Sequence, residues 1–189
     1  MNADEMLRRI RGEMRAKRAA MGAPEQMCAA HAVYARLRES EVYRRARVVM
    51  GYAAVRGELS VDALMRDALM SGKTLVLPRC APEGRMTARC VRELSGLQNG
   101  MYGVPEPPED AMRIHPAQID LILVPGVAVG RGGERLGQGG GYYDRFLPES
   151  PAFRLGICHG FALLRDLAQH EHDVRMDAVL TPEEWIDCE

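Results

Sequence analysis

A glycine-rich segment at residues 126–141 contains the residue types that bind phosphate groups. Eight of the chain's 19 glycines lie within these sixteen positions, far more than an even distribution would place there. Because glycine has no side chain, the backbone N–H groups of such a segment can approach a phosphate closely. Arg135 adds a guanidinium that is always charged and can bind a phosphate through two hydrogen bonds. Asp144 adds a carboxylate, the ligand that Mg²⁺ prefers. The segment predicts a phosphate-binding loop with a metal ligand beside it, and Tyr142 and Tyr143 can stack on a planar ring or bond to a ligand.

Two well-known glycine patterns do not fit this chain. A dinucleotide-binding G-x-G-x-x-G pattern that starts at Gly137 would need glycine where Tyr142 stands. The Gly72–Thr74 segment resembles the end of a P-loop, but Asp67 occupies the position of the first glycine. A flexible surface hairpin is the remaining structural interpretation of residues 126–141. The Arg, Leu, Tyr and Asp side chains interleaved with the glycines argue against it.

The segments around the loop show the patterns of strands that alternate with helices. Helices are expected where apolar residues recur every three or four positions, with Pro24 in a first turn and Ser60 at an N-cap. Short apolar runs bounded by Gly or Pro are expected to be strands. The expected helices cover residues 4–21, 24–40, 61–71, 140–147 and 161–169, and the expected strands cover residues 48–53, 74–78, 86–91, 119–124, 154–159 and 178–181.

These elements predict an α/β fold in a single domain. The strands are apolar throughout, which favours a mostly parallel sheet covered by helices on both faces. The glycine-rich loop follows the strand at 119–124 and runs into a helix. Ligands of open α/β sheets bind at the carboxyl ends of strands, and a helix N-terminus adds partial positive charge there. We therefore expect the loop to lie at the ligand-binding edge of the sheet.

Charge and composition exclude several classes of protein. The chain has 25 Lys and Arg against 26 Asp and Glu, a net charge of −1, so no nucleic-acid partner is expected. No apolar run is long enough to cross a membrane, and basic residues interrupt the N-terminal segment, so neither a membrane span nor a signal peptide is expected. The five cysteines include no C-x-x-C pair, which fits a reducing cytoplasm.

The stretch RLGQGGGYYDRFL, preceded by DLILVPGVAV, closely resembles the signature of the 5-formyltetrahydrofolate cyclo-ligase family, also called 5,10-methenyltetrahydrofolate synthetases. The family's R-L-G-x-G-x-G-Y-Y-D core is present in full. The resemblance covers nearly the whole chain. It includes a basic N-terminal helix ending at 18–21, Gly57 and Glu58 after a strand, G-K-x-x-x-L-P at 72–78, a Y-G-V-P-E-P segment at 102–107, and His172-Asp173-Val174 through Asp177.

This resemblance implies a three-layer αβα sandwich and a specific activity. The implied reaction converts 5-formyltetrahydrofolate to 5,10-methenyltetrahydrofolate with ATP and Mg²⁺, and it releases ADP and phosphate. The formyl oxygen is phosphorylated first, which activates the formyl carbon for attack by the neighbouring folate nitrogen. Phosphoryl transfer needs positioning and charge neutralisation more than a covalent nucleophile, and a glycine loop, an arginine and a metal carboxylate supply both. The implied partners are a reduced folate and ATP. The protein is expected to be a monomer or a small homo-oligomer.

The resemblance also assigns roles to individual residues. Arg135 and Tyr143 are implied to be catalytic. Asp144 and Asp177 are implied to bind the metal, although Asp177 alone reads as an ordinary loop acid. The residues implied to bind ATP are Arg8, Arg11, Arg135, Leu136, Gly137, Gln138, Gly139, Gly140, Gly141, Tyr142 and Tyr143. The residues implied to contact the folate are Ala53, Glu58, Gln138, Gly139, Gly140, Gly141 and Tyr142.

Two departures from the family pattern leave alternatives open. The family usually has A-F-D after V-P-G-V, whereas Gly130 stands here in place of the carboxylate. It usually has an acid or aromatic residue and then Gln after the strand ending near Cys158, whereas this chain has residues 159–162 as HGFA. The chain is alternatively a folate- or nucleotide-binding regulatory protein with weakened catalysis. A sugar-phosphate isomerase or transferase lacks an evident base beside the loop, and an H-x-H zinc pair at 170–172 lacks a third ligand.

Overall fold

The computed structural model describes residues 2–169 and 173–188, so the H-x-H pair lies outside the described residues. The helices are α1 (Ala3–Ala20), α2 (Ala23–Glu39), α3 (Glu41–Arg45), α4 (Asp62–Met70) and α5 (Tyr142–Phe146). The strands are β1 (Val48–Met50), β2 (Thr74–Ala81), β3 (Arg85–Val91), β4 (Gln98–Asn99), β5 (Pro105–Glu106), β6 (Arg113–Ile114), β7 (Leu121–Pro125), β8 (Ala128–Gly130), β9 (Arg135–Leu136), β10 (Phe153–Ile157), β11 (Leu163–Leu164), β12 (Ala178–Leu180) and β13 (Trp185–Asp187).

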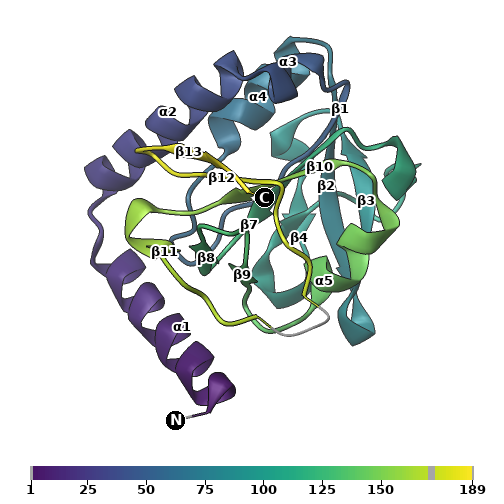
Figure 1. Ribbon diagram of the computed structural model, residues 1–189. Coiled ribbons are helices and arrows are strands. Elements are labelled where there is room, and N and C mark those ends of the chain that lie inside the picture. Colours follow the sequence, from purple (N-terminus) through teal and green to yellow (C-terminus); the bar gives the residue numbers. More distant parts are fainter. Residues whose placement is uncertain (1, 170–172, 189) are drawn as a thin grey trace.

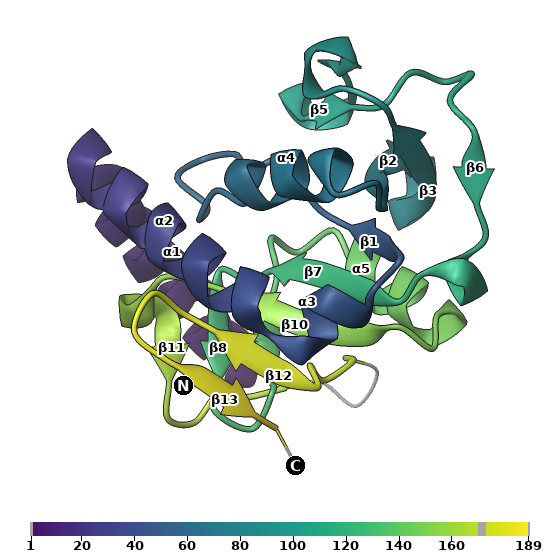
Figure 2. The same cartoon turned by 90° about the horizontal axis from the view of Figure 1, so that it is seen from above.

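Within the described residues, eight strands form one large sheet in the order β13-β12-β10-β7-β1-β2-β3-β6. The order from β13 to β2 can be followed across the molecule in Figure 2. The five strands from β12 to β2 run parallel; β13 pairs antiparallel with β12 at one edge, and at the other edge β3 pairs antiparallel with β2 and β6 antiparallel with β3. The mostly parallel sheet predicted from the apolar strands is confirmed.

Both faces of this sheet are buried, which explains why its central strands lack polar alternation. Leu121 and Leu123 of β7 pack into a core with residues of α2, α3 and α4. Ile122 and Val124 point to the opposite face and pack with Phe146 of α5. Figure 1 shows α2, α3 and α4 on one side of the sheet and α5 on the other. The fold is the expected α/β arrangement with helices flanking a central sheet.

A second, smaller sheet joins the N-terminal helix to the glycine-rich segment. Its strands lie in the order β11-β8-β9. Leu7 and Met14 on the apolar side of α1 pack against Val129 and Leu136 of this sheet. Because the glycine loop begins directly after β9, this packing places α1 beside the loop. None of the described helices is long and apolar enough to cross a membrane.

Two local predictions are wrong. The helix expected at 161–169 is instead a short 3-10 turn followed by β11, because Leu163 and Leu164 pair in parallel with β8. This pairing depends on contacts distant in sequence, which overrode the local helical pattern. Ser60 is not the N-cap of α4: Val61 occupies that position, and the Ser60 hydroxyl accepts a hydrogen bond from the N–H of Asp62 at 3.2 Å.

Candidate active site

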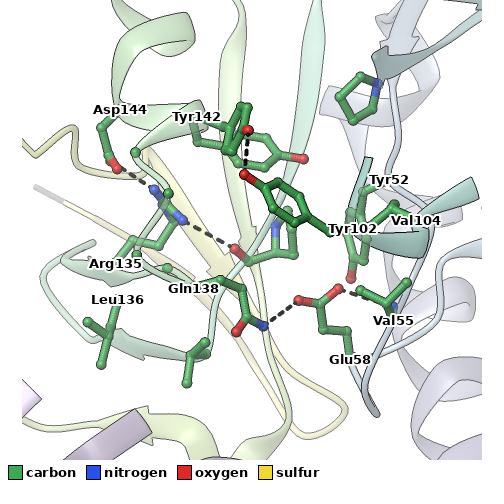
Figure 3. A pocket seen from close by; sticks show the side chains of 18 of the residues that line it. Tyr52, Val55, Glu58, Tyr102, Val104, Arg135, Leu136, Gln138, Tyr142 and Asp144 are labelled. Carbon is green, nitrogen blue, oxygen red and sulfur yellow. Dashed lines mark hydrogen bonds and ion pairs between the residues drawn. The ribbon is translucent and has the colours of Figure 1, made fainter. Parts of the chain in front are cut away.

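A cavity of about 570 Å³ opens at the carboxyl ends of β1 and β7, where the fold predicts a ligand site. Its walls come from α1, the segment after β1, the Tyr102 segment, the glycine loop after β9 and the start of α5. Figure 3 shows side chains of the segment after β1, the Tyr102 segment, the glycine loop and α5 around the cavity. The volume is in the range of small-molecule sites in proteins.

The glycine loop at residues 137–141 is fixed by arginine side chains that bind its carbonyl oxygens. Arg11 of α1 donates from Nε to the Gly137 oxygen at 3.0 Å. Arg145 of α5 donates to the Gly140 oxygen at 3.0 Å and to the Gly84 oxygen at 3.3 Å. No residue in 2–169 or 173–188 accepts a hydrogen bond from the backbone N–H groups of residues 137–141. These N–H groups are therefore available to the oxygens of a ligand.

Two positions in this loop require glycine. Gly139 has φ +103° and Gly141 has φ +68°, both in the region that residues with a side chain rarely adopt. Gly141 is also the N-cap of α5. That helix has only five residues, so its dipole sums few peptide units and contributes little charge. An anion at this loop would contact the backbone N–H groups, which have no partner in the described residues, and the nearby arginines, and would gain little from the helix dipole expected from the sequence.

Arg135 lines the cavity, and its guanidinium group is held in place by Asp144 and Tyr143. Its side chain is 4% exposed, and Nη2 lies 2.8 Å from the Asp144 carboxylate. The guanidinium carbon lies 5.4 Å from the centre of the Tyr143 ring, a cation–π distance. The buried Nε has no hydrogen-bond partner in the described residues. Because Nε is enclosed by the protein, the guanidinium would act on a ligand in the cavity through its charge.

Tyr143 supports Arg135 and does not act as a base at neutral pH. Burial is the main cause that raises the pKa of its phenol, and the Glu58 carboxylate raises it further. The phenol is therefore protonated and can only donate its hydrogen or accept through its oxygen lone pairs. The hydrogen bond with Tyr102 raises the pKa of the neighbouring Tyr142 to about 12, so this phenol is protonated as well.

Glu58 faces the glycine loop from the opposite wall. Its Oε1 accepts a hydrogen bond from the Gln138 amide at 3.0 Å, and its Oε2 accepts one from the N–H of Val55 at 3.2 Å. Arg15 of α1 donates to the other end of the Gln138 amide at 2.9 Å. The site thus has a carboxylate at one end of the cavity and the Arg135 guanidinium at the other (Figure 3).

The structure brings most of the sequence-predicted site residues together. The cavity is lined by Ala53, Glu58, Arg11, Arg135, Leu136, Gly137, Gln138, Gly139, Gly140, Gly141, Tyr142, Tyr143 and Asp144. Arg8 is exposed and does not line it. Asp177 lies before the amino end of β12, the opposite edge of the sheet, where its carboxylate accepts hydrogen bonds from Arg154 at 2.7 to 3.3 Å. The structure does not bring Asp177 to the cavity.

Sequence reasoning missed several residues that line the cavity. Tyr52 and Arg56 come from the segment after β1, Tyr102 from the segment between β4 and β5, and Asp173 from the chain before β12. Arg56 and Tyr102 have positive φ values of 53° and 61°, and each precedes a glycine that also has positive φ. The Arg56-Gly57 and Tyr102-Gly103 pairs are therefore tight turns. Such X-Gly pairs were the available signal that the chain bends toward the cavity there.

The sequence and the fold match those of known proteins. The sequence profile of the 5-formyltetrahydrofolate cyclo-ligase family matches residues 3–182, nearly the whole chain. The chain belongs to the 5-formyltetrahydrofolate cyclo-ligase family. It is 30% identical over 149 residues to the 5-formyltetrahydrofolate cyclo-ligase of Escherichia coli, covering 74% of this chain and 82% of that protein. It is 29% identical over 170 residues to a probable 5-formyltetrahydrofolate cyclo-ligase of Caenorhabditis elegans, covering 82% of each.

A solved structure in this family has the same fold. The NMR structure of Aquifex aeolicus 5,10-methenyltetrahydrofolate synthetase superposes with a TM-score of 0.86 and 26% identity. The alignment covers 96% of this chain and 92% of that chain. The resemblance drawn from the RLGQGGGYYD segment is confirmed at the level of family and fold.

Gly130, where the chain departs from the family pattern, lies outside the cavity. Gly130 is buried in β8 and does not line the site. A Cβ built at Gly130 would lie 2.3 Å from a carboxylate oxygen of Glu134, so the Glu134 side chain fills this space. Glu134 is itself paired with Arg175 at 2.9 Å. The absence of a carboxylate at position 130 therefore gives no structural support to the alternative of weakened catalysis.

Proposed function

We propose that the chain catalyses the ATP-dependent cyclisation of 5-formyltetrahydrofolate to 5,10-methenyltetrahydrofolate. Family membership makes this the leading activity. One structural observation carries it: a loop whose backbone N–H groups have no partner in residues 2–169 and 173–188, together with a buried guanidinium, lies in the same cavity as a carboxylate on the opposite wall. The end of the cavity with the loop N–H groups and the guanidinium suits a polyphosphate. The Glu58 carboxylate at the other end suits a ligand with N–H donors, such as a pterin ring.

The reaction follows from the needs of a formamide. Its carbon is a poor electrophile, so the formyl oxygen attacks the γ-phosphorus of ATP and the bond to ADP breaks. The neighbouring folate nitrogen then attacks the activated formyl carbon, and its proton is lost to solvent. The carbon–oxygen bond breaks and inorganic phosphate leaves. Charge develops on phosphate oxygens in both steps, close to Arg135 and the loop N–H groups, which act as fixed electrostatic partners.

Mg²⁺ fits this site as an ion shared with ATP rather than as a resident metal. No group of three or more His, Cys, Asp or Glu side chains in the described residues is arranged to hold a metal. Mg²⁺ at nucleotide sites usually takes one or two carboxylates and completes its shell with phosphates and water. Asp144, which lines the cavity beside Arg135, supplies such a carboxylate. The ion would neutralise phosphate charge during transfer.

We also propose a cytoplasmic location. All five cysteines are unpaired, from the exposed Cys28 to the buried Cys158, as expected of a chain that folds in a reducing compartment.

The proposed activity predicts product formation that needs all three reactants. Purified protein with ATP, Mg²⁺ and 5-formyltetrahydrofolate should release ADP and raise the absorbance of methenyltetrahydrofolate in equal amounts. Tetrahydrofolate without a formyl group is the matched control, and it should release no ADP above background because it has no oxygen to phosphorylate. A folded protein that forms no methenyltetrahydrofolate under these conditions would contradict the proposal.

A further inference from the structure

The Glu58 carboxylate stands on a turn, residues 55–59, that has open space on both sides. The main cavity lies on one side, and a cleft of about 480 Å³ between this turn and α2 lies on the other. Glu58 lines both hollows. Leu59 at the end of the turn is buried in the core, but side-chain packing does not fix the residues before it on these two open faces. The position of Glu58 therefore depends on the hydrogen bonds that hold the turn.

In the described residues, the hydrogen bonds of this turn come from within it and from three outside residues, one of which, Gln138, donates to the Glu58 side chain at 3.0 Å. Within the turn, the Glu58 N–H donates to the Val55 oxygen at 3.0 Å and the Val55 N–H donates to Glu58 Oε2 at 3.2 Å. From outside, the Tyr52 hydroxyl donates to the Leu59 oxygen at 2.6 Å. His159, which follows β10, lies with Nε2 3.0 Å from the Gly57 oxygen. Among the described residues, His159 thus ties the backbone of the turn to an element outside the β1–α4 connection, whereas Gln138 contacts only the Glu58 side chain.

His159 is itself held rigidly. Its side chain is 2% exposed, and its ring stacks on Phe161 at a centroid distance of 5.2 Å with an angle of 7° between the planes. Nδ1 is buried without a partner in the described residues. Because a carbonyl oxygen only accepts hydrogen bonds, the Nε2 atom must carry the proton that it donates to Gly57. Burial lowers the pKa of this imidazole, so it is neutral at pH 7.

Gly57 lies close to α1. Its φ is +71°, and a Cβ built on it would lie 3.1 Å from the Cβ of Arg18, so the turn already rests against α1. Arg18 is buried and donates to the oxygens of Gly126 and Val127, which fixes α1 to the end of β7. The turn is therefore held between Arg18 on one side and the His159 hydrogen bond on the other.

We propose that His159 is a positioning residue for Glu58, and that it sets the affinity of the site for the folate. The inference rests on the proposed function, in which Glu58 contacts the folate. His159 has no direct access to the main cavity, so it acts only through the Gly57 carbonyl and the turn. Loss of its hydrogen bond releases the turn and weakens folate binding, while the ATP side of the cavity, formed by the glycine loop and Arg135, keeps its geometry.

The variant that tests this is His159→Phe, which keeps a ring for stacking on Phe161 but removes the donor. We expect its KM for 5-formyltetrahydrofolate to rise about tenfold, the size of effect expected from leaving a carbonyl without its hydrogen bond. The KM for ATP should change less than about twofold. His159→Gln places an amide nitrogen the same number of bonds from Cα and should restore most of the folate affinity. His31→Phe, in the cleft on the far side of the turn, is the matched control and should leave both KM values unchanged.

Hydrogen exchange gives a second readout that does not depend on activity. The amides of Val55 and Glu58 should exchange faster in His159→Phe than in the unmodified protein and in His159→Gln. An unmodified protein that forms no methenyltetrahydrofolate contradicts the proposed function, and the exchange rates then decide the role of His159. The role of His159 as a positioning residue would be overturned by any of three results in His159→Phe: unchanged exchange of these amides, an unchanged KM for the folate, or an equal rise in the KM values for folate and ATP.

Discussion

Replacing Arg135 with leucine is expected to lower kcat at least about 10³-fold, the scale of loss when a guanidinium that stabilises phosphoryl-transfer charge is removed. The side chain is almost fully buried at the base of the cavity, paired with Asp144 and stacked over the Tyr143 ring. Leucine cannot supply the positive charge of the guanidinium. Arg135→Lys keeps the charge but loses the planar fork, so its activity should lie between the two. Steady-state assays of ADP release measure the effect.

The matched control for this change is Arg131→Leu. Arg131 also forms a short ion pair with a carboxylate, 2.6 Å from Glu184, but it does not line the cavity and both partners are largely solvent-exposed. Exposed pairs contribute little to stability, so this variant should keep more than about half of the activity. Thermal unfolding of each variant separates loss of chemistry from loss of fold. A folded Arg135→Leu protein with more than about a tenth of the unmodified activity would be inconsistent with an electrostatic role in phosphoryl transfer.

Asp144→Asn and Asp177→Asn are expected to differ sharply in their dependence on Mg²⁺. In Asp144→Asn, the amide oxygen would still accept a hydrogen bond from Arg135, but the site would lose the charge that binds a hard cation. We expect about a 10²-fold loss of ATP turnover at millimolar Mg²⁺, with partial recovery as Mg²⁺ rises and little change in folate KM. A Mg²⁺ titration of ADP release measures this. The effect follows from the place of Asp144 beside Arg135 in the cavity.

The Asp177 variant should keep the unmodified response to Mg²⁺. Asp177 lies at the opposite edge of the sheet, where its carboxylate already accepts three hydrogen bonds from Arg154. Its replacement should lower the free energy of unfolding by about 1 kcal/mol through the loss of charge-assisted bonds. The family resemblance assigns Asp177 to the metal, whereas its position in the fold places it away from the cavity. The two therefore give opposite predictions for the Asp177 variant. A Mg²⁺ requirement that rises equally in both variants would show that the resemblance, rather than the position of Asp177 in the fold, describes its role.

The glycine loop was predictable from the sequence because its chemistry is contiguous. Arg135, the glycines and Asp144 lie within ten positions, so a short stretch of sequence already contains the anion-binding backbone, the cation and the carboxylate. The parallel sheet was predictable for a similar reason, since each apolar strand shows its burial along its own length.

The contacts between distant parts of the chain could not be found this way, because long-range packing makes them. Glu58 was assigned to the site only through the family resemblance, and its contact with Gln138, 80 positions away, forms because β1 and β7 are neighbours in the sheet. Tyr102 reaches the cavity through a turn with positive φ that its residue type does not favour. Asp177 was expected at the site but lies elsewhere. The sequence shows that it directly precedes a strand, but only the direction of β12 in the sheet shows that Asp177 lies at the edge opposite the site.

The proposed mechanism requires that ATP bound at the glycine loop phosphorylates the formyl oxygen. The most direct measurement uses 5-formyltetrahydrofolate with ¹⁸O in the formyl group, and mass spectrometry of the phosphate released in ordinary water. If the oxygen attacks the γ-phosphorus, the phosphate released with each methenyltetrahydrofolate carries one ¹⁸O atom. Phosphate without ¹⁸O, with the label found in water instead, would mean that ATP is hydrolysed separately from cyclisation and would contradict the mechanism.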